Sequence, residues 1–486
     1  MTSITPVALT RRALAARTGL PGEPAPVRIA HLGLGAFHRA HQAWYTSVAG
    51  DADEWGIAAF TGRRRHAAEE LQAQDGLYSL TVRSTTGDAV NIVGSISEAV
   101  DGALVDRLID TVAAHSTALV TLTITEAGYA LDVHGRPDLA DDTVAADLDW
   151  LRRNLHASRF DLSDAPRSAL ARLVAGVEAR RRAGAGDLAI VSCDNLPDNG
   201  ALARTGMLAL AELAGAAATH EYLTAHVTFV STSVDRITPK STPEDVAAVT
   251  AATGWRDRTP VVTEPFHDWV LSGEFRSGRP DWERAGARFV DDIDPFERRK
   301  LWLLNGSHTL LAYAGAARGH QTVAEAISDS AIRPCVEEFW NEAARHLPAE
   351  GLELDDYRAA LLERFHNARI QHLLGQIGQD GTTKLRVRIA PILMAERRAG
   401  RDGAASARVL GAWVAEARKG RLPADRASDA VQRAVVLGGE RAVIALLSLV
   451  DGELASDPDI VTAVSRAALS FERGRTRTQF PEGTPT

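Results

Sequence analysis

The sequence predicts an α/β fold in two parts, an N-terminal domain built on a largely parallel sheet and a mostly α-helical C-terminal domain. Over the first part of the 486-residue chain, short apolar runs typical of strands alternate with helical stretches rich in alanine and leucine. From Asp294 onward, apolar residues recur instead at the three- and four-residue spacing of helices. The length also favours two or three domains over one.

The first predicted strand opens the segment "VRIAHLGLGAFHRAHQAWYTSV", which we interpret as a strand, a tight glycine turn and a helix. Further strand-like runs follow, several of them separated by helical stretches, at residues 55–60, 78–82, 118–125, 188–195 and 225–237. This alternation predicts strands that pair in parallel and carry helices on their faces. We assign residues 1–285 to this dinucleotide-binding domain, because the pattern changes there.

The second domain, residues 286–486, is predicted to be helical and to carry substrate-binding and catalytic groups. Its amphipathic stretches lie at residues 295–317, 333–347, 354–367, 407–418 and 441–450. The final segment, "FERGRTRTQFPEGTPT", is polar and rich in proline and glycine, which predicts a frayed end.

Composition excludes several classes of protein. Hydrophobic residues make up 45% and charged residues 24%, an ordinary globular mixture, and the net charge of -9 gives a nucleic-acid partner no electrostatic support. Cys193 and Cys335 are the only cysteines, which argues against a disulfide framework or a cysteine-based zinc site and leaves a disulfide between them as a minor alternative. No apolar run approaches the roughly 20 residues of a membrane span, and no secretory signal is recognisable. We expect a cytoplasmic protein, either a monomer or a small homo-oligomer.

A glycine turn follows the first predicted strand. Gly33 and Gly35 occupy the first two glycine positions of a G-x-G-x-x-G turn, where the missing Cβ lets the backbone approach a pyrophosphate. His38 stands at the third position, so an ordinary strand-to-helix turn is the alternative. The next helix would direct its first amides at the phosphates, which makes Ala36 and Phe37 further candidates for cofactor binding.

The residues after the second strand bear on the choice between NAD and NADP. An acid there binds the ribose 2′-hydroxyl group, whereas a basic residue accommodates a 2′-phosphate. The segment "FTGRRRH" has no acid and supplies Arg63, Arg64 and Arg65. It indicates tolerance of NADP or a preference for it, with a solvated basic turn as the alternative. Glu126, which follows the strand-like run in "TLTITEAGY", is another candidate for cofactor binding, and simple turn chemistry is its alternative.

Three histidines cluster in this part of the sequence. His38 and His41 lie three residues apart on the predicted helix, and His31 precedes them. The spacing would suit a metal ion, but no nearby carboxylate or cysteine set completes a site. We therefore favour packing and hydrogen-bonding roles and expect no metal.

The segment "KLWLLNGSH" sets Lys300, Asn305 and His308 into an apolar helix. At 3.6 residues per turn, Asn305 lies about 140° and His308 about 80° around the axis from Lys300, so all three fit on one broad face. A lysine in a partly dry site can serve as the base for an alcohol proton, amides can hold a developing alkoxide, and a histidine can orient a hydroxyl group. The alternative is an amphipathic helix whose polar groups make interior hydrogen bonds.

Polar residues also stand directly after predicted strands, where α/β sheets present ligand-binding groups. Asn195 occupies such a position in "VSCDNLPDNG", and Asp235 with Arg236 occupies another in "SVDRITP". The alternatives are turn chemistry for Asn195 and a local ion pair for the other two residues.

Together these segments resemble the mannitol dehydrogenase family of polyol-specific long-chain dehydrogenases/reductases, over about residues 27–450. The segment "VDRITP", with Phe229 upstream, is similar to the signature of that family. Residues 278–315 form the most specific block, and the other matching pieces are "GLGAFHRAHQ", "TLTITEAGY", "SCDNLPDNG", "TEPFHDWVL" and "QDGTTK".

The resemblance implies a zinc-independent oxidoreductase that uses NAD or NADP. It also implies an N-terminal Rossmann-type domain, a mostly helical C-terminal domain and an active site between them. The implied roles are a general base at Lys300, amides holding the reacting oxygen at Asn195 and Asn305, a substrate-positioning group at His308, and substrate contacts at Asp235 and Lys384.

The substrate hypothesis is a small molecule, with a sugar alcohol and a ketose, mannitol and fructose, considered first. The alternative is a sugar acid, in the reduction of fructuronate to mannonate. Gln371 and Leu373 stand where arginines are expected in sugar-acid members, which weakens that alternative. A non-catalytic nucleotide sensor is an alternative of another class, and the presence of the lysine and both asparagines argues against it.

Overall fold

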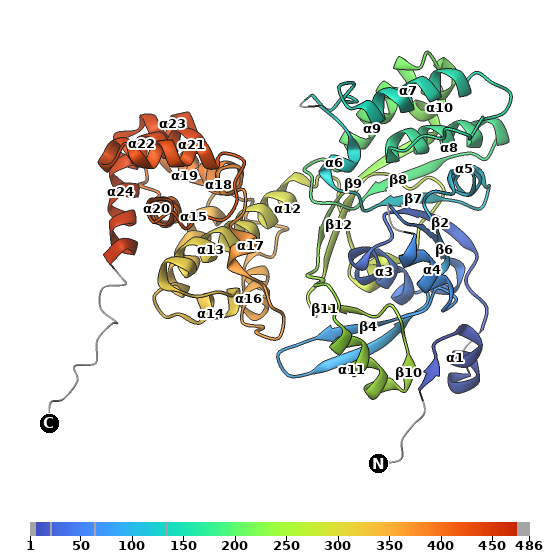
Figure 1. Cartoon of the computed structure of the whole chain (residues 1–486), viewed down its shortest axis with the longest axis horizontal. Coiled ribbons are helices and arrows are strands. Elements are labelled where there is room, and N and C mark those ends of the chain that lie inside the picture. Colours follow the sequence, from blue (N-terminus) through green and yellow to red (C-terminus); the bar gives the residue numbers. More distant parts are fainter. Residues whose placement is uncertain (1–5, 20–21, 63–64, 133, 474–486) are drawn as a thin grey trace. The chain divides into compact units, whose positions relative to one another are not determined.

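The computed structural model describes residues 6–19, 22–62, 65–132 and 134–473. The chain forms two compact units, Met1–Asp294 and Pro295–Thr486, which we describe separately (Figure 1). Arg63, a predicted cofactor residue, and its neighbour Arg64 lie outside the described residues. Cys193 is buried and Cys335 is half-buried, and both thiols are free. Within the described ranges, no helix is long and apolar enough to cross a membrane.

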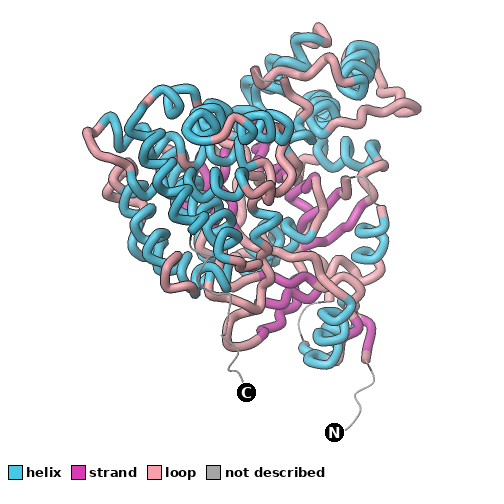
Figure 2. The backbone as a smooth tube through the Cα atoms, turned by 60° about the vertical axis from the view of Figure 1, so that its left-hand side comes forward, coloured by secondary structure: helices cyan, strands magenta, loops and turns pink. Residues whose placement is uncertain are grey.

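Unit 1 is organised around an eight-stranded sheet with the order β13-β12-β9-β8-β7-β2-β3-β6. Its strands run side by side in the tube view (Figure 2). Six of them pair in parallel, namely β6 (Ile96–Val100), β3 (Gly56–Phe60), β2 (Val27–Leu32), β7 (Leu119–Leu122), β8 (Leu188–Ser192) and β9 (Val227–Asp235). Numbered along the chain, these six give the order 3-2-1-4-5-6, which is that of a dinucleotide-binding sheet. The predicted Rossmann-type domain with a largely parallel sheet is confirmed.

Two further strands extend the sheet beyond β9. β12 (Asp268–Ser272) runs antiparallel to β9, and β13 (Arg288–Phe289) pairs in parallel with β12. The chain order reverses at β2, which lies between β3 and β7. Open α/β sheets bind ligands beyond the carboxyl ends of the strands at such a reversal point.

Both faces of the sheet are covered because successive side chains along each strand point to opposite faces. Ala30 and Leu32 of β2 belong to one hydrophobic core, whereas Ile29 belongs to the other. The first core is completed by α5 (Val105–Ala113), α7 (Asp142–Asn154), α8 (Ala169–Ala183), α9 (Asn199–Leu213) and α10 (Ala217–His226). The second is completed by α2 (Ala36–Ala40), α3 (Gln42–Val48) and α4 (His66–Gln72). The two sets of helices are separated by the strands in Figure 1.

Smaller elements complete unit 1. The predicted strand at residues 78–82 is β4 (Tyr78–Arg83), and it lies in a separate three-stranded sheet with β5 (Asp88–Val93) and β11 (Val261–Thr263). The remaining elements are β1 (Val7–Ala8), which pairs with β10 (Trp255–Arg256), the helices α1 (Arg11–Thr18), α6 (Glu126–Tyr129) and α11 (Pro243–Thr253), and the short 3-10 turns η1 (Ala52–Glu54) and η2 (Trp282–Ala285).

Unit 2 consists of helices and loops over its described residues, as the sequence predicts. Its helices are α12 (Asp294–Arg299), which begins at the last residue of unit 1, η3 (Lys300–Asn305), α13 (Gly306–Arg318), α14 (Val323–Ser328), α15 (Arg333–Ala344), α16 (Leu354–Phe365), α17 (Leu374–Ile377), α18 (Gly381–Arg388), α19 (Ala390–Arg398), α20 (Ala404–Arg418), α21 (Ser428–Val436), α22 (Gly439–Val450), α23 (Gly452–Ser456) and α24 (Pro458–Arg473).

The centre of unit 2 is formed by α13, α20 and the helices that contact them. Both α13 and α20 have buried residues on most sides. Small residues let helices approach closely here, since a Cβ at Gly411 of α20 would stand 2.4 Å from the Cβ of Ala467 in α24. Close packing of this kind fixes the position of α13, which carries His308.

Candidate active site

The glycine turn after β2 is fixed by the neighbouring strand. Gly33 has a φ of +112°, in the left-handed region, and a Cβ there would stand 2.2 Å from the carbonyl oxygen of Thr123. Gly35 precedes α2 in extended backbone, and a Cβ there would meet the Gly33 carbonyl oxygen at an ordinary 3.6 Å. The fold itself therefore requires glycine at residue 33, whereas the backbone conformation and the packing at residue 35 would accept a side chain.

Three interior histidines support this turn. His31 bridges two threonines of the adjacent chain segment, with Nδ1 2.7 Å from Thr121 Oγ1 and Nε2 3.0 Å from Thr123 Oγ1. His38, at the third glycine position, stacks on His31 with ring centroids 3.3 Å apart, and Nε2 of His41 donates to the Asp268 carbonyl at 3.0 Å. Burial lowers the pKa values of His31 and His41 to about 3.

These contacts place the histidines in packing and hydrogen-bonding roles. In the part of the chain that the structure describes, no group of three or more histidine, cysteine, aspartate or glutamate side chains is arranged to hold a metal ion.

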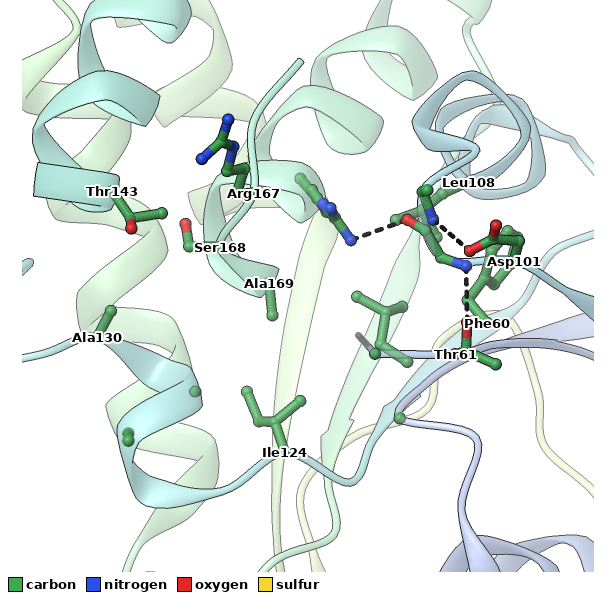
Figure 3. Close-up of a pocket in the computed structure, with 18 of the residues that line it drawn as sticks. Phe60, Thr61, Asp101, Leu108, Ile124, Ala130, Thr143, Arg167, Ser168 and Ala169 are labelled. Atoms are coloured by element: carbon green, nitrogen blue, oxygen red, sulfur yellow. Dashed lines mark hydrogen bonds between the residues drawn. The ribbon is translucent and has the colours of Figure 1, made fainter. Parts of the chain in front are cut away.

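A cavity of about 830 Å³ lies at the carboxyl ends of β2, β3, β6 and β7, beside the reversal point of the sheet (Figure 3). Of the predicted cofactor residues, Gly33 lines it, whereas Gly35, Ala36, Phe37 and Glu126 are not part of its lining. The remaining lining residues are Leu32, Phe60, Thr61, Gly62, Arg65, Asp101, Gly102, Ala103, Leu108, Ile124, Ala127, Gly128, Ala130, Asp141, Thr143, Arg167, Ser168, Ala169 and Arg172.

Hydrogen bonds between side chains and the backbone fix the β6 end of this cavity. Asp101 Oδ1 accepts from the N–H of Ala103 at 3.0 Å, and the N–H of Gly102 donates to Thr61 Oγ1 at 2.9 Å (Figure 3). Arg172 donates from Nη1 to the Gly102 carbonyl at 3.0 Å, and burial lowers the pKa of its guanidinium. A Cβ at Gly102 would stand 1.8 Å from the Thr61 carbonyl oxygen, so this loop packs tightly against the end of β3.

The rim of the cavity carries both acids and cations. Asp141 caps α7 by accepting from the N–H groups of Thr143 and Val144, which lowers the pKa of its carboxyl group. Asp101 is likewise engaged with a backbone N–H. Arg65 and Arg167 are exposed lining residues. The cavity is large enough for the adenosine part of a dinucleotide, and the arginines that line it suit a phosphate group.

The other predicted residues of unit 1 lie at strand ends. Asn195 is exposed in the loop after β8, and its neighbour Asp194 accepts from the Tyr129 hydroxyl and from the Leu196 N–H at 2.9 Å. Asp235 is buried at the end of β9.

Arg236, next to Asp235, has contacts of its own. It donates to the Ala40 carbonyl at 2.6 Å and lies over the Trp44 ring at 4.5 Å. Burial lowers the pKa of the Arg236 guanidinium to about 10. This arginine therefore ties the end of β9 to the α2–α3 segment.

In unit 2, the segment "KLWLLNGSH" departs from the predicted α-helix. Residues Lys300–Asn305 form a π-helical turn, η3, and the N–H of Gly306 donates to the Leu301 carbonyl, five residues back. The predicted 140° offset between Lys300 and Asn305 is wrong, because it assumed 3.6 residues per turn. In a turn closed by hydrogen bonds between residues i and i+5, the two side chains come onto the same side of the helix. Such turns occur frequently at functional sites.

His308 lies one turn further along, in α13. It is 8% exposed, and its ring packs against Phe365 and His372 at centroid distances of 5.1 and 4.7 Å. Burial lowers its pKa well below the ordinary value, and the positive charges of His372, Arg364, Arg388 and Lys384 lower it further. His308 is therefore neutral at neutral pH.

Lys384 and Arg388 bring two of these cations from one helix, α18. Lys384 Nζ donates to the Ile377 carbonyl at 2.8 Å, and burial, with Arg388 as the next cause, lowers the pKa of the amine. Arg388 Nη1 donates to the Asn305 carbonyl at 3.3 Å and to Thr309 Oγ1 at 3.2 Å. Within unit 2, Arg388 thus contacts the backbone of Asn305 and its charge acts on both His308 and Lys384, whereas Asn195 and Asp235 belong to unit 1.

Several residues at these sites were not predicted from the sequence. Arg388 stands four residues after the predicted Lys384, a spacing that places both on one helix face and could have identified it. Thr61 and Asp101 follow strands and Arg172 lies in α8, all without a recognisable motif, so no comparable signal marked them.

Two family models match the chain. The model described as the mannitol dehydrogenase Rossmann domain matches residues 27–284, and that of the mannitol dehydrogenase C-terminal domain matches residues 292–471. D-arabinitol 4-dehydrogenase of Ralstonia nicotianae is 38% identical over 378 residues, 76% of this chain and 78% of its own. D-mannonate oxidoreductase of Escherichia coli is 36% identical over 374 residues, 74% of each chain.

A solved structure is similar over most of the chain. It is that of Pseudomonas fluorescens mannitol 2-dehydrogenase in ternary complex with NAD and D-mannitol, with a TM-score of 0.75 and 32% identity. The match covers 92% of both chains. The similarity therefore extends through both units.

Proposed function

The chain belongs to the mannitol dehydrogenase family, and from this premise we propose that it interconverts a sugar alcohol and a ketose, with Lys300 as the general base. Relatives that are dehydrogenases of polyols and of a sugar acid identify the chain as a nicotinamide-dependent dehydrogenase that acts on a CH–OH group. The observation that supports the proposal is η3, a π-helical turn that contains both Lys300 and Asn305 and continues into α13, which carries His308.

The proposed chemistry assigns one step to each polar group. The amine of Lys300, uncharged, takes the hydroxyl proton of the alcohol, and in the reverse direction its ammonium form returns that proton to the carbonyl oxygen. The amide N–H groups of Asn195 and Asn305 hold the oxygen as negative charge develops on it. Neutral His308 orients a neighbouring hydroxyl group of the substrate. The nicotinamide ring, when bound, supplies the acceptor or donor of the hydride.

Residues of the unit 1 cavity fit the coenzyme. The turn at Gly33 has no side chain because a Cβ there would clash with the Thr123 carbonyl oxygen. The loop at Gly102 is held by hydrogen bonds to Thr61 and Arg172. These groups would hold the pyrophosphate and the adenosine, while Asp235 and Lys384 remain proposed substrate contacts.

The direct test of the proposed base is Lys300→Ala. We expect turnover to fall by about three orders of magnitude, within the range that general acid–base catalysis contributes. Coenzyme binding, measured by fluorescence titration, should stay within about twofold of wild type, since the cavity in unit 1 is unchanged. Near-normal turnover of the variant on its best substrate would refute the role of this lysine.

Coenzyme choice is a finer part of the proposal, and the cavity favours NADP. Arg65 and Arg167 line it, whereas both lining acids already accept backbone N–H groups. We expect a lower KM for NADP than for NAD. Arg65→Ser should raise the KM for NADP about tenfold, because a charged phosphate contact is lost, and should leave the KM for NAD unchanged.

The matched control is Arg204→Ser, which alters an exposed arginine of α9 outside the cavity. It should change neither KM. Two results together would contradict the preference for NADP. The wild-type protein would have a lower KM for NAD than for NADP, and the ratio of these two KM values would be the same in Arg65→Ser as in Arg204→Ser.

A sugar acid is the second candidate substrate, and the cations around His308 favour it. Arg364, Arg388 and Lys384 all contribute positive charge to that part of unit 2, which suits a substrate carboxylate. Rates on mannitol and mannonate, each with NAD and NADP, decide between the two. A kcat/KM for mannonate more than tenfold above that for mannitol would replace the first proposal with the second.

A further inference from the structure

Two backbone carbonyls in and next to the π-helical turn accept hydrogen bonds from side chains. The Leu303 carbonyl accepts from Ser307 Oγ at 2.6 Å and from Trp340 Nε1 at 2.9 Å. The Asn305 carbonyl accepts from Thr309 Oγ1 at 3.0 Å and, as described above, from Arg388. A carbonyl oxygen has two lone pairs, and serine and threonine often donate to the carbonyl four residues earlier in regular helices as well. The donors that are particular to this turn are therefore Trp340 and Arg388, which come from other helices.

The donor Trp340 comes from a different helix, α15, which packs directly against the turn. Trp340 is 2% exposed, and a buried indole N–H needs an acceptor. The preceding residue, Phe339, touches Gly306 so closely that a Cβ there would stand 2.7 Å from its ring. Gly306 is the first residue after η3, so α15 contacts the helix where the wide turn ends.

A change of the turn to regular α-helix would break these contacts. Narrowing by one residue would shift the Leu303 carbonyl along the helix, away from the buried indole N–H of Trp340 that now donates to it, and a buried N–H without an acceptor is unfavourable. It would also rotate the Asn305 side chain away from that of Lys300. The side-chain donors and the wide turn therefore stabilise each other.

We propose that Trp340 and Arg388 are positioning residues, which hold the π-helical turn open from α15 and α18 and so align the Lys300 amine with the Asn305 amide. This inference rests on the proposed function, since it presumes that Lys300 and Asn305 act on the substrate. Neither Trp340 nor Arg388 has to touch the substrate to have this effect.

The test is Trp340→Phe in the full chain, which keeps an aromatic ring in the core but removes the N–H donor. Misplacing a reacting group by about 1 Å can cost about 100-fold in rate, so we expect kcat to fall by about tenfold or more. The KM and the Kd of the coenzyme should stay within about twofold, because the lost alignment matters in the transition state rather than in binding.

Trp413→Phe is the matched control. Trp413 is also a fully buried tryptophan of unit 2, in α20, but its Nε1 has no hydrogen-bond partner among the described residues. Both variants lose the same atoms from the interior, so general loosening of the core should affect them alike. Equal kcat values for the two variants would overturn the proposal.

Ser307→Ala provides a second approach if Trp340→Phe folds poorly. It removes the other side-chain donor to the Leu303 carbonyl and replaces serine with the best helix former. We expect kcat to fall at least threefold with no loss of thermal stability, and an unchanged kcat would count against the role of these donors.

Lys300→Ala, assayed in parallel, distinguishes failure of the proposed function from failure of the positioning role. If it retains turnover, the proposed function fails and the positioning role fails with it. If it loses turnover while Trp340→Phe behaves like Trp413→Phe, Lys300 remains the base and only the positioning role is wrong.

Discussion

At the scale of single residues, Gly33 has the most exacting position in the coenzyme turn. Its left-handed φ and the 2.2 Å approach to the Thr123 carbonyl oxygen leave no space for a side chain. Gly33→Ala should therefore lower the free energy of unfolding by about 1–3 kcal/mol and raise the coenzyme Kd at least tenfold. Chemical denaturation and fluorescence titration measure the two effects.

Gly35→Ala is the control, because residue 35 is extended and a Cβ there makes an ordinary contact. It should leave the unfolding midpoint close to wild type, since the new methyl group meets only the Gly33 carbonyl oxygen at an ordinary distance. Equal stability of the two variants would show that the strain at Gly33 is relieved elsewhere.

Single residues also show what a sequence can reveal about the site. Gly33 and Lys384 carry recognisable motifs, and the structure gives both a defined environment. Arg172 and Thr61 act through backbone contacts to the Gly102 loop, which depend on how distant segments meet. Contacts of that kind have no local sequence pattern, so they could not be predicted.

At the scale of elements, the sequence predicts the helix around Lys300 but not its wide turn. Apolar spacing in "KLWLLNGSH" is compatible with both α- and π-helical geometry over so short a segment. What selects the wider form is tertiary contact, from Trp340 of α15 and Arg388 of α18, and neither is close in sequence.

The edge strand β6 was missed for a different reason. Its residues Ile96–Val100 include serine and glutamate, and its burial alternates weakly, so the segment lacks the apolar run of a central strand. The other parallel strands are nearly all buried and were predicted within a few residues of their observed ends.

A test at the element scale concerns the start of α20. Glu342 of α15 is buried and accepts from the N–H groups of Ala405 and Ser406, each at 2.8 Å, and from the Ser406 hydroxyl at 2.7 Å. Glu342→Gln should lower the free energy of unfolding by about 1–3 kcal/mol, because charged hydrogen bonds to the helix start are lost. Calorimetry should detect a lower Tm for the transition of unit 2.

Glu337→Gln serves as the comparison on the same helix. Glu337 is exposed and pairs with Arg333 four residues earlier, an interaction that contributes little to stability. A Tm decrease as large as that of Glu342→Gln would indicate that loss of charge, and not loss of the cap, is responsible.

At the scale of the whole molecule, the fold class and the family were predictable, since strand alternation and long motif blocks extend over most of the chain. The order of strands in the sheet was not, because pairing depends on crossovers that leave no local trace. The proposed site residues are distributed over both units, and the spacing within either half of the sequence gives no information about the other.

The buried histidines make the stability of unit 1 depend on pH. His31 and His41 have pKa values of about 3 in the folded state, against about 6.5 when unfolded, because burial disfavours their charged form. Below pH 6.5 the unfolded chain binds protons that the folded chain does not, so stability falls as the pH decreases toward 3. Between pH 7 and pH 5 each histidine should cost about 2 kcal/mol, measurable as a falling Tm.

Substitution identifies the source of this slope. His41→Gln keeps a donor for the Asp268 carbonyl and should flatten the dependence, whereas His115→Gln, at an exposed position, should not change it. The pKa of Glu396 is about 2, held down by arginine and histidine partners that outweigh its burial, so this carboxylate titrates outside the measured window. His31 should keep its share of the slope in this variant, so a slope as steep in His41→Gln as in wild type would assign the effect to other groups.

The glycine turn and the loops around Arg65 come from different strands of the sheet. Under the proposed coenzyme site, affinity for the phosphates common to both coenzymes and discrimination between NAD and NADP would therefore depend on separate segments of backbone. The residues after β3 could then be substituted without changing the glycine turn at Gly33, which packs against Thr123. A change of coenzyme, in the laboratory or in evolution, would then need substitutions in that one segment only.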